Sequence, residues 1–453
     1  PPALVHAVAQ ERRPRYVGFE VSTSLPPELA DLEPLARNYW WSWDPEAQGL
    51  FRSISERMWR ESDRNPLTFL SRVYPSDAAA RARDPEFLAR LRRVVDRFRA
   101  YVEADPLDGW DGAPLSPRHP VAYFSLEFGV HPSLRVYSGG LGILAGDHLK
   151  SASDLRLPLV GVGLFYRRGY VRQELAPGGE QLSLDSENDP RALPIELVRD
   201  AAGAPLSVVV HLTGAPVALQ VWRASVGRVP LFLLDADVEG NRPEDRALTA
   251  RLYGGGIEDR IRQEILLGKG GVRLLELLDV EPRVVHMNEG HAAFAALERA
   301  SRLVHEQGLT FDEAREVVRA TTAFTTHTPV PAGHDVFSED LMRRHFPDCE
   351  RWIGLPWEKF MALGQQADGR FNMTYLSLSM AGWVNGVARK HGEVSRALLH
   401  AFWPGLAVDE VPVGHVTNGV HLATWVRPGI ARVLGVAERA VRPDDFAAGA
   451  AAL

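Results

Sequence analysis

A strand, a glycine-rich loop, a helix and a second strand follow one another between residues 121 and 165, and this unit restricts the fold most. Residues 121–128 read VAYFSLEF and residues 159–165 read LVGVGLF, both typical of buried strands. The loop Ser138-Gly139-Gly140-Leu141-Gly142 lies between them, before a predicted helix that ends near residue 155. Two strands joined by a helix favour a parallel sheet with right-handed crossovers. We therefore expect an α/β fold with a doubly wound, Rossmann-like domain.

The alternation of strands and helices continues toward the C-terminus. The pattern predicts antiparallel strands as an insertion within residues 207–234, a helix at 259–278, a strand at 283–288, helices at 291–306 and 311–319, and a strand at 320–326. The alternation extends to residues 414–420. We therefore assign residues 119–453 to one Rossmann-like catalytic domain.

Residues 25–118 show apolar residues at helical spacing rather than alternating strands and helices, and they are predicted to form a helical module. Apolar residues recur at helical spacing before the WWSW stretch of residues 40–43, and residues 85–102 form an amphipathic pattern. Three tryptophans within four residues agree with core packing and also with stacking on sugar rings. Prolines and glycines at residues 106–120 mark the passage into the next domain. Residues 1–24 are treated as an N-terminal extension.

Charge and cysteine content exclude several classes of protein. The formal net charge is −7 and basic residues are not clustered, which does not suit a nucleic-acid binder or a polybasic membrane contact. The one cysteine, Cys349, lies in a predicted polar loop, so a disulfide, a cysteine-based zinc site and cysteine acyl transfer are not expected. No apolar run is long enough for a membrane span, and the N-terminus does not resemble a secretory signal. We expect a cytoplasmic protein.

The loop of Gly139, Gly140, Leu141 and Gly142 is the first candidate site. Glycines allow the backbone to approach a ligand closely, and a helix N-terminus presents free N–H groups and a partial positive charge. Such a loop suits an anion, usually a phosphate. Its spacing matches neither the dinucleotide fingerprint nor the Walker A loop, and an ordinary turn into a helix accounts for the same residues.

Polar clusters follow two of the predicted strands. Asn288, Glu289 and His291 come directly after one strand, and His327 ends the next. Ligands of open α/β folds bind beyond the carboxyl ends of strands, where such side chains act as acids, bases or hydrogen-bonding groups. The alternative is structural, namely a helix cap and satisfied histidines. The spacing of His286, Glu289 and His291 lacks two histidines at i,i+4, so no metal site is expected.

Two further turns carry asparagine and glycine, at residues 385–391 and 417–420. Asparagine suits the left-handed turn conformation, and it also suits hydrogen bonding to glycan hydroxyls. The strand-end clusters, these turns and the anion-ready loop together predict a pocket at one edge of the sheet.

Taken in order, these motifs resemble those of α-glucan phosphorylases. The stretches that carry the resemblance are SLEF at 125–128, SGGLG at 138–142, THT at 326–328, VNGVA at 384–388 and TNG at 417–419. Residues 38–43, NYWWSW, resemble the helical module of the bacterial branch of that family. The resemblance runs from about residue 25 to the C-terminus. It implies a glycosyltransferase-B architecture with the active site between two domains.

The resemblance also implies a reaction. Family members use inorganic phosphate to cleave α-1,4-glucans such as glycogen or maltodextrin, and they release glucose 1-phosphate with retention of configuration. They depend on pyridoxal 5′-phosphate held on a lysine, and many are homodimers.

Residue roles follow by resemblance alone. The loop Gly139–Gly142 is similar to the one that lines the cofactor and substrate phosphates. Glu127 resembles a glutamate near the glucosyl site, and His327 resembles a histidine that contacts glucose at the cleavage subsite. Asn288, Glu289 and His291 match a family Asn-Asp-Thr-His motif, with Glu in place of Asp and Gly in place of Thr.

The cofactor lysine is not found in its family context. Lys150, Lys269, Lys359 and Lys390 all lack the Gly-Asn-Met-Lys-like surroundings of that site. We therefore expect this chain to be the N-terminal half of the enzyme, with the cofactor lysine on a second domain, and to be inactive alone. Two alternatives stay open: a nucleotide-sugar-dependent glucan synthase, and a non-catalytic glucan-binding module.

Overall fold

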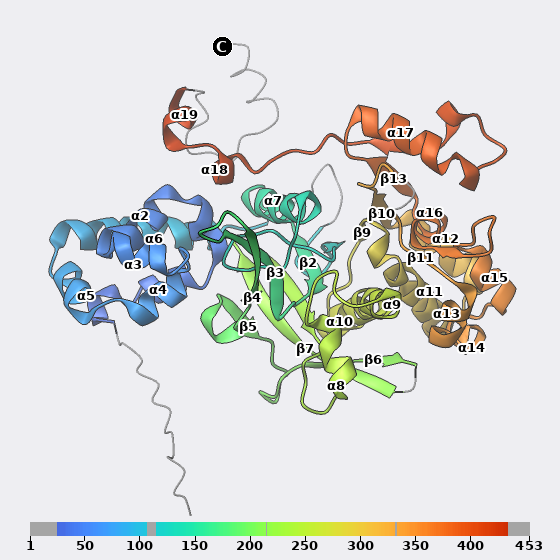
Figure 1. The fold of residues 1–453 in the computed structure, drawn as a ribbon, viewed down its shortest axis with the longest axis horizontal. Coiled ribbons are helices and arrows are strands. Elements are labelled where there is room, and N and C mark those ends of the chain that lie inside the picture. Colours follow the sequence, from blue (N-terminus) through green and yellow to red (C-terminus); the bar gives the residue numbers. More distant parts are fainter. Residues whose placement is uncertain (1–24, 107–114, 214, 331–332, 434–453) are drawn as a thin grey trace, which may run out of the picture.

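The computed structural model describes residues 25–106, 115–213, 215–330 and 333–433. The expected extension at residues 1–24 lies outside this part of the chain. A helical region formed by residues 25–106 lies on one side of a central sheet, and the helices that follow β9 lie on the other (Figure 1). The chain after β14 crosses back over the sheet toward the helical region (Figure 1).

The central sheet has ten strands in the order β14-β13-β10-β9-β1-β2-β8-β7-β5, with β6 paired to β7. The strands from β14 to β8 are all parallel. They span β1 (Val121–Phe124), β2 (Leu159–Leu164), β8 (Val229–Asp235), β9 (Val284–Asn288), β10 (Thr322–Thr325), β13 (Trp383–Gly386) and β14 (Gly414–His415). The chain builds outward from β1 to β8 and then returns to β9 on the other side of β1. Strand order therefore reverses at β1, the place where open α/β sheets bind ligands.

Antiparallel strands extend the sheet beyond β8. They are β5 (Ile195–Leu197), β6 (Ser207–Leu212) and β7 (Ala215–Val226). The predicted antiparallel strands are present, but they are not a separate insertion. β8 pairs with β7 on one edge and in parallel with β2 on the other, so both patterns share one sheet.

The hairpin of β3 (Arg168–Leu175) and β4 (Gln181–Glu187) was not expected from the sequence. Its second strand begins with a short alternation, QLSLD, but its first strand, RGYVRQEL, has no apolar–polar alternation. A second short pair joins β11 (Val336–Phe337) to β12 (Phe371–Asn372).

Helices fill the region of residues 25–106. They are α1 (Leu32–Ala36), α2 (Pro45–Ile54), α3 (Glu56–Glu61), α4 (Pro66–Arg72), α5 (Pro75–Ala82) and α6 (Pro85–Glu103), with short 3-10 turns at Pro27–Leu29 and Tyr39–Trp43. Trp40, Trp41 and Trp43 are buried, so core packing is the arrangement found. Trp41 packs edge-on against Trp59 at 5.8 Å between ring centroids. The Asn38 side chain pairs with both the N–H and the C=O of Gly227, which joins the helical region to the β7–β8 turn.

The remaining helices follow β1 along the chain. They are α7 (Gly140–Asp154), α8 (Pro243–Arg246), α9 (Ile257–Ile265), α10 (Gly271–Leu277), α11 (Phe294–Gln307), α12 (Phe311–Ala320), α13 (Glu339–His345), α14 (Cys349–Ile353), α15 (Trp357–Ala362), α16 (Met373–Met380), α17 (Arg389–Leu399), α18 (Leu422–Trp425) and α19 (Pro428–Val433). Within the described ranges, no helix is long and apolar enough to cross a membrane.

Three expected elements differ in the structure. The strand expected at residues 121–128 ends at Phe124, because the Ser125 hydroxyl donates to the Glu127 carbonyl oxygen at 2.9 Å and turns the chain. The helix expected at 259–278 contains a π turn, Leu266–Gly270, where a Cβ on Gly268 would lie 2.6 Å from the Ala295 nitrogen. Cys349 is not in a polar loop. It begins α14 and is buried, with its thiol 3.6 Å from the Leu355 carbonyl oxygen.

Candidate active site

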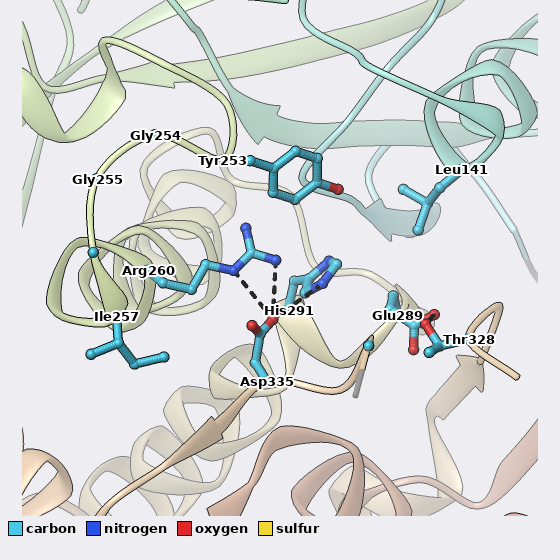
Figure 2. A pocket seen from close by; sticks show the side chains of 12 residues that line it. Leu141, Tyr253, Gly254, Gly255, Ile257, Arg260, Glu289, His291, Thr328 and Asp335 are labelled. Carbon is cyan, nitrogen blue, oxygen red and sulfur yellow. Dashed lines mark hydrogen bonds and ion pairs between the residues drawn. The ribbon is translucent and has the colours of Figure 1, made fainter. Parts of the chain in front are cut away.

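A cavity of about 430 Å³ lies beside the carboxyl ends of β1, β9 and β10. Residues from four separated stretches of the chain surround it (Figure 2). The lining residues are Leu141, Tyr253, Gly254, Gly255, Gly256, Ile257, Arg260, Glu289, His291, Thr328, Gly333 and Asp335. The cavity therefore occupies the edge where strand order reverses, as expected for an open α/β sheet.

The first turn of α7 reaches this cavity through Leu141. Gly139 caps the helix without a side-chain hydrogen bond, so the first backbone N–H groups are left for a ligand. A Cβ on Gly139 or Gly140 would meet no atom within 4 Å. Gly142 is different, because its Cβ would lie 2.5 Å from the Tyr137 Cβ. The outer glycines thus leave an open, anion-ready surface, while Gly142 permits tight packing underneath.

Glu127 lies beneath the glycine loop rather than among the residues that line the cavity. It is buried, and its carboxylate accepts hydrogen bonds from the Ser138 N–H at 2.7 Å and the Gly139 N–H at 3.2 Å. The Tyr253 hydroxyl also donates to it. The carboxylate is fully occupied by these partners, so it holds the shape of the loop.

Glu289 follows β9 with φ of 72°, an unusual backbone conformation for a residue with a side chain. Its carboxylate accepts a hydrogen bond from the His327 N–H at 2.7 Å, and from the hydroxyls of Thr326 and Thr328 at 3.3 and 3.2 Å. Burial raises the pKa of Glu289, and these hydrogen bonds offset part of the increase. Glu289 therefore ties the end of β10 to the end of β9 at the cavity wall.

Asn288 and His327 form a second link between the same strand ends. The Asn288 amide nitrogen donates to the Ser125 hydroxyl at 3.1 Å, so its oxygen accepts from His327 Nε2 at 2.6 Å. Burial lowers the pKa of His327 to about 4, so the ring is neutral at pH 7. With the proton on Nε2, the other ring nitrogen is a hydrogen-bond acceptor.

His291, Asp335 and Arg260 form a charged group at the cavity (Figure 2). Arg260 Nη2 lies 3.0 Å from Asp335 Oδ2, and His291 Nε2 lies 3.3 Å from the same oxygen. Burial and the nearby Arg260 lower the pKa of His291 to about 3, so its contact with Asp335 is polar rather than ionic at pH 7. Burial and the charge of Asp335 raise the pKa of Glu264, which lies 3.2 Å from Arg260 Nε. Arg260 therefore contacts two carboxyl groups, those of Asp335 and Glu264.

Comparison with known proteins gives two family matches. Residues 275–447 match the model of the carbohydrate phosphorylase family, and residues 25–134 match a family described as a protein of unknown function, DUF3417. The glycogen phosphorylase of Mycobacterium tuberculosis (strain ATCC 25618 / H37Rv) is 45% identical over 428 residues, which cover 90% of this chain and 50% of that protein. The maltodextrin phosphorylase of Thermococcus litoralis is 42% identical over 417 residues, which cover 92% of this chain and 49% of that protein.

This chain belongs to the carbohydrate phosphorylase family. It spans about half the length of these two relatives.

Some residues of the phosphorylase-type motifs line the cavity, and others lie behind it. Leu141, Glu289 and His291 line it, while Glu127, Asn288 and His327 support the residues that do. Tyr253, Arg260 and Asp335 were not expected from the sequence. Three consecutive glycines at residues 254–256 are typical of a loop, but no local pattern connects Arg260 with an aspartate 75 residues later.

Pyridoxal phosphate, the cofactor implied for carbohydrate phosphorylases, fits these residues in part. The open backbone of Gly139 and Gly140 suits its phosphate group. Its covalent attachment has no candidate here, because no lysine is among the described residues that line the cavity. Lys150 and Lys269 are buried elsewhere, and Lys359 and Lys390 are exposed. In the same described ranges, no group of three or more His, Cys, Asp or Glu side chains is arranged to hold a metal ion.

Proposed function

We propose that this chain forms the glucan-binding side of an α-glucan phosphorylase, which transfers a glucosyl unit from an α-1,4-glucan to inorganic phosphate. One observation carries the proposal: the N-terminus of α7, open and uncapped, faces the same cavity as Glu289 and His291. Anion-binding backbone and polar side chains together suit a sugar and a phosphate bound side by side.

In this proposal the strand-end residues bind and orient the sugar. Glu289, His291 and Thr328 line the part of the cavity that would take the sugar, and Asn288 and His327 hold the strand ends behind them. The backbone N–H groups of Gly140 and Leu141 hold phosphate oxygens, while Glu127 accepts from the Gly139 N–H and fixes that loop from below. The cavity wall therefore sets the relative position of the two substrates.

The bound cofactor would supply a phosphate group that exchanges a proton with the substrate phosphate. We propose that residues 119–453 form the first domain of a glycosyltransferase-B architecture. Its remaining site groups, including the cofactor lysine, would come from sequence outside these 453 residues. Such an enzyme would act in the cytoplasm, in keeping with a free buried cysteine, and could pair as a homodimer.

The test uses the whole protein that contains this chain. We expect phosphate-dependent release of glucose 1-phosphate from maltodextrin, and no release by residues 1–453 alone. Release without phosphate, or incorporation from a nucleotide sugar, would favour a glucan synthase. Glucan binding with no turnover in either assay would favour a binding module.

A further inference from the structure

The chain after β14 leaves the sheet and returns to α7 (Figure 1). Residues 416–420, here named the bridge segment, are exposed along their whole length. Its first half is tied to the end of β13, because the N–H groups of Val416 and Asn418 donate to the carbonyl oxygens of Gly386 and Val387, each at 2.9 Å. The next residue, His421, is buried, so the bridge segment ends at a second fixed point.

Two aspartates of α7 hold that second point. Asp147 Oδ2 accepts from the His421 N–H at 3.1 Å and from Trp425 Nε1 at 2.7 Å. His421 Nε2 lies 2.9 Å from Asp154 Oδ2. Asp147 is itself buried, so these are hydrogen bonds to a carboxylate shielded from water, which are stronger than exposed ones.

A lysine of the same helix completes the contact. Lys150 is almost entirely buried, and its ammonium group donates to the Thr424 hydroxyl at 3.1 Å. The same hydroxyl lies 2.8 Å from His421 Nδ1. Both ring nitrogens of His421 therefore have a hydrogen-bond partner, and His421 is not among the residues that line the cavity.

The helical region of residues 25–106 closes the cluster from outside. Trp43 packs edge-on against the His421 ring at 5.4 Å, and the Lys150 ammonium lies 5.6 Å from the Trp43 ring. Tyr101 of α6 donates to Asp154 at 2.6 Å. Trp43 thus contacts both α7 and the end of the bridge segment, and Tyr101 contacts α7.

We propose that the helical region, which matches a family of unknown function, anchors the bridge segment and thereby positions its Thr417-Asn418-Gly419 motif. An exposed segment held at one end pivots freely, whereas one held at both ends over a few residues has far fewer conformations. The hydrogen bonds of His421 and Thr424 with α7 are here named the anchor. Trp43 covers the anchor and excludes water from it. The anchor itself stands apart from the proposed function, and only its effect on glucan binding rests on that function.

The experiment compares two equal tryptophan substitutions in the whole protein. Trp43→Leu removes the cover of the anchor. Trp59→Leu is the control, because Trp59 is equally buried and its ring packs against Trp41, Phe51 and Phe69 inside the helical region. Amide hydrogen exchange of peptides that cover residues 416–427 is the readout. We expect Trp43→Leu to speed exchange in these peptides roughly tenfold or more, because it weakens the hydrogen bond from the His421 N–H to the Asp147 carboxylate. Trp59→Leu should leave the exchange rate unchanged.

Asp154→Asn gives a milder second variant that leaves the core of the helical region intact. It should speed exchange in the same peptides with little change in the melting temperature. In the active enzyme, Trp43→Leu and Asp154→Asn should raise KM for maltodextrin more than they lower kcat. Unchanged exchange in both variants, or an equal effect of Trp59→Leu, would overturn the anchor. Faster exchange in an enzyme without phosphorylase activity would overturn the proposed function and leave the anchor standing.

Discussion

The two ends of α7 contrast sharply in how their polar groups are satisfied. At the N-terminal end, Leu141 lines a cavity, the helix has no side-chain cap from Gly139, and no atom lies against the Cβ positions of Gly139 and Gly140. At the other end, Asp147, Lys150 and Asp154 are joined to His421 and its neighbours by direct hydrogen bonds. One helix thus carries an open site and a closed one. The open end is arranged to receive a ligand, whereas the closed end holds the chain together.

Adding a negative charge at the open end is the largest expected effect. Gly140→Asp should lower phosphorylase activity about 100-fold or more, because a carboxylate would replace an anion at the helix N-terminus. Gly140→Ala fits without a clash and isolates the steric contribution, so its loss should be much smaller. The rate of glucose 1-phosphate release from maltodextrin measures the activity of both variants. Full activity in Gly140→Asp would show that no anion binds there.

Removing a buried charge at the closed end should alter the pH dependence of stability. Burial lowers the pKa of Lys150 from 10.5 to about 8. Between these values the unfolded chain keeps a proton that the folded chain has lost, so this residue makes stability rise with pH. The rise reaches about 3 kcal/mol, at about 1.4 kcal/mol per pH unit.

Lys150→Met should remove that contribution. The stability of the variant relative to the natural protein should therefore be highest below pH 8 and should fall as the pH rises toward 10.5. Urea unfolding at a series of pH values gives the difference. A difference that stays constant across this range would show that Lys150 titrates normally in the folded protein.

Gly142→Ala should destabilise the open end by about 1–3 kcal/mol, the usual cost of overpacking. Its Cβ would lie 2.5 Å from the Tyr137 Cβ and 2.8 Å from Glu127 Oε2. Gly139→Ala is the matched control, since its Cβ would meet nothing within 4 Å. Thermal unfolding of the two variants compares them directly. Equal melting temperatures would mean that the loop adjusts without cost.

Thr424→Val is expected to have the smallest effect, a loss of about 1 kcal/mol of stability. It removes the hydroxyl that accepts from Lys150 and contacts His421, and it keeps the volume of the side chain. Thr424→Ser retains the hydroxyl and should restore the stability. If the serine variant is as unstable as the valine variant, the methyl group rather than the hydrogen bond stabilises the closed end.

Local signals predicted the helices well, because the groups that begin and end a helix are near in sequence. α6 begins at Pro85 behind Asp84, whose carboxylate accepts from the N–H groups of Glu86 and Phe87. α12 begins with a capping box between Thr310 and Glu313. The β3–β4 hairpin was missed because its stability comes from strand pairing rather than from an apolar pattern.

Three of the twelve residues that line the cavity were predictable by one rule. Leu141, Glu289 and His291 follow strands, and the carboxyl ends of parallel strands meet at one edge of a sheet. Arg260 and Asp335 were not predictable, because their pairing joins α9 to a loop 75 residues later. The supporting positions of Glu127 and His327 also required the structure, since sequence cannot distinguish a residue that lines a cavity from one directly behind it.

The amino-acid sequence by itself determined the α/β class, the helical region, the glycine loop before α7 and the likeness to phosphorylases. Each of these depends on short-range periodicity or on residues that are contiguous in the chain. Only the tertiary structure decided that α7 is open at one end and closed at the other. That difference arises from contacts between α7 and residues more than 270 positions away, and packing of distant elements, rather than local propensity, brings such residues together.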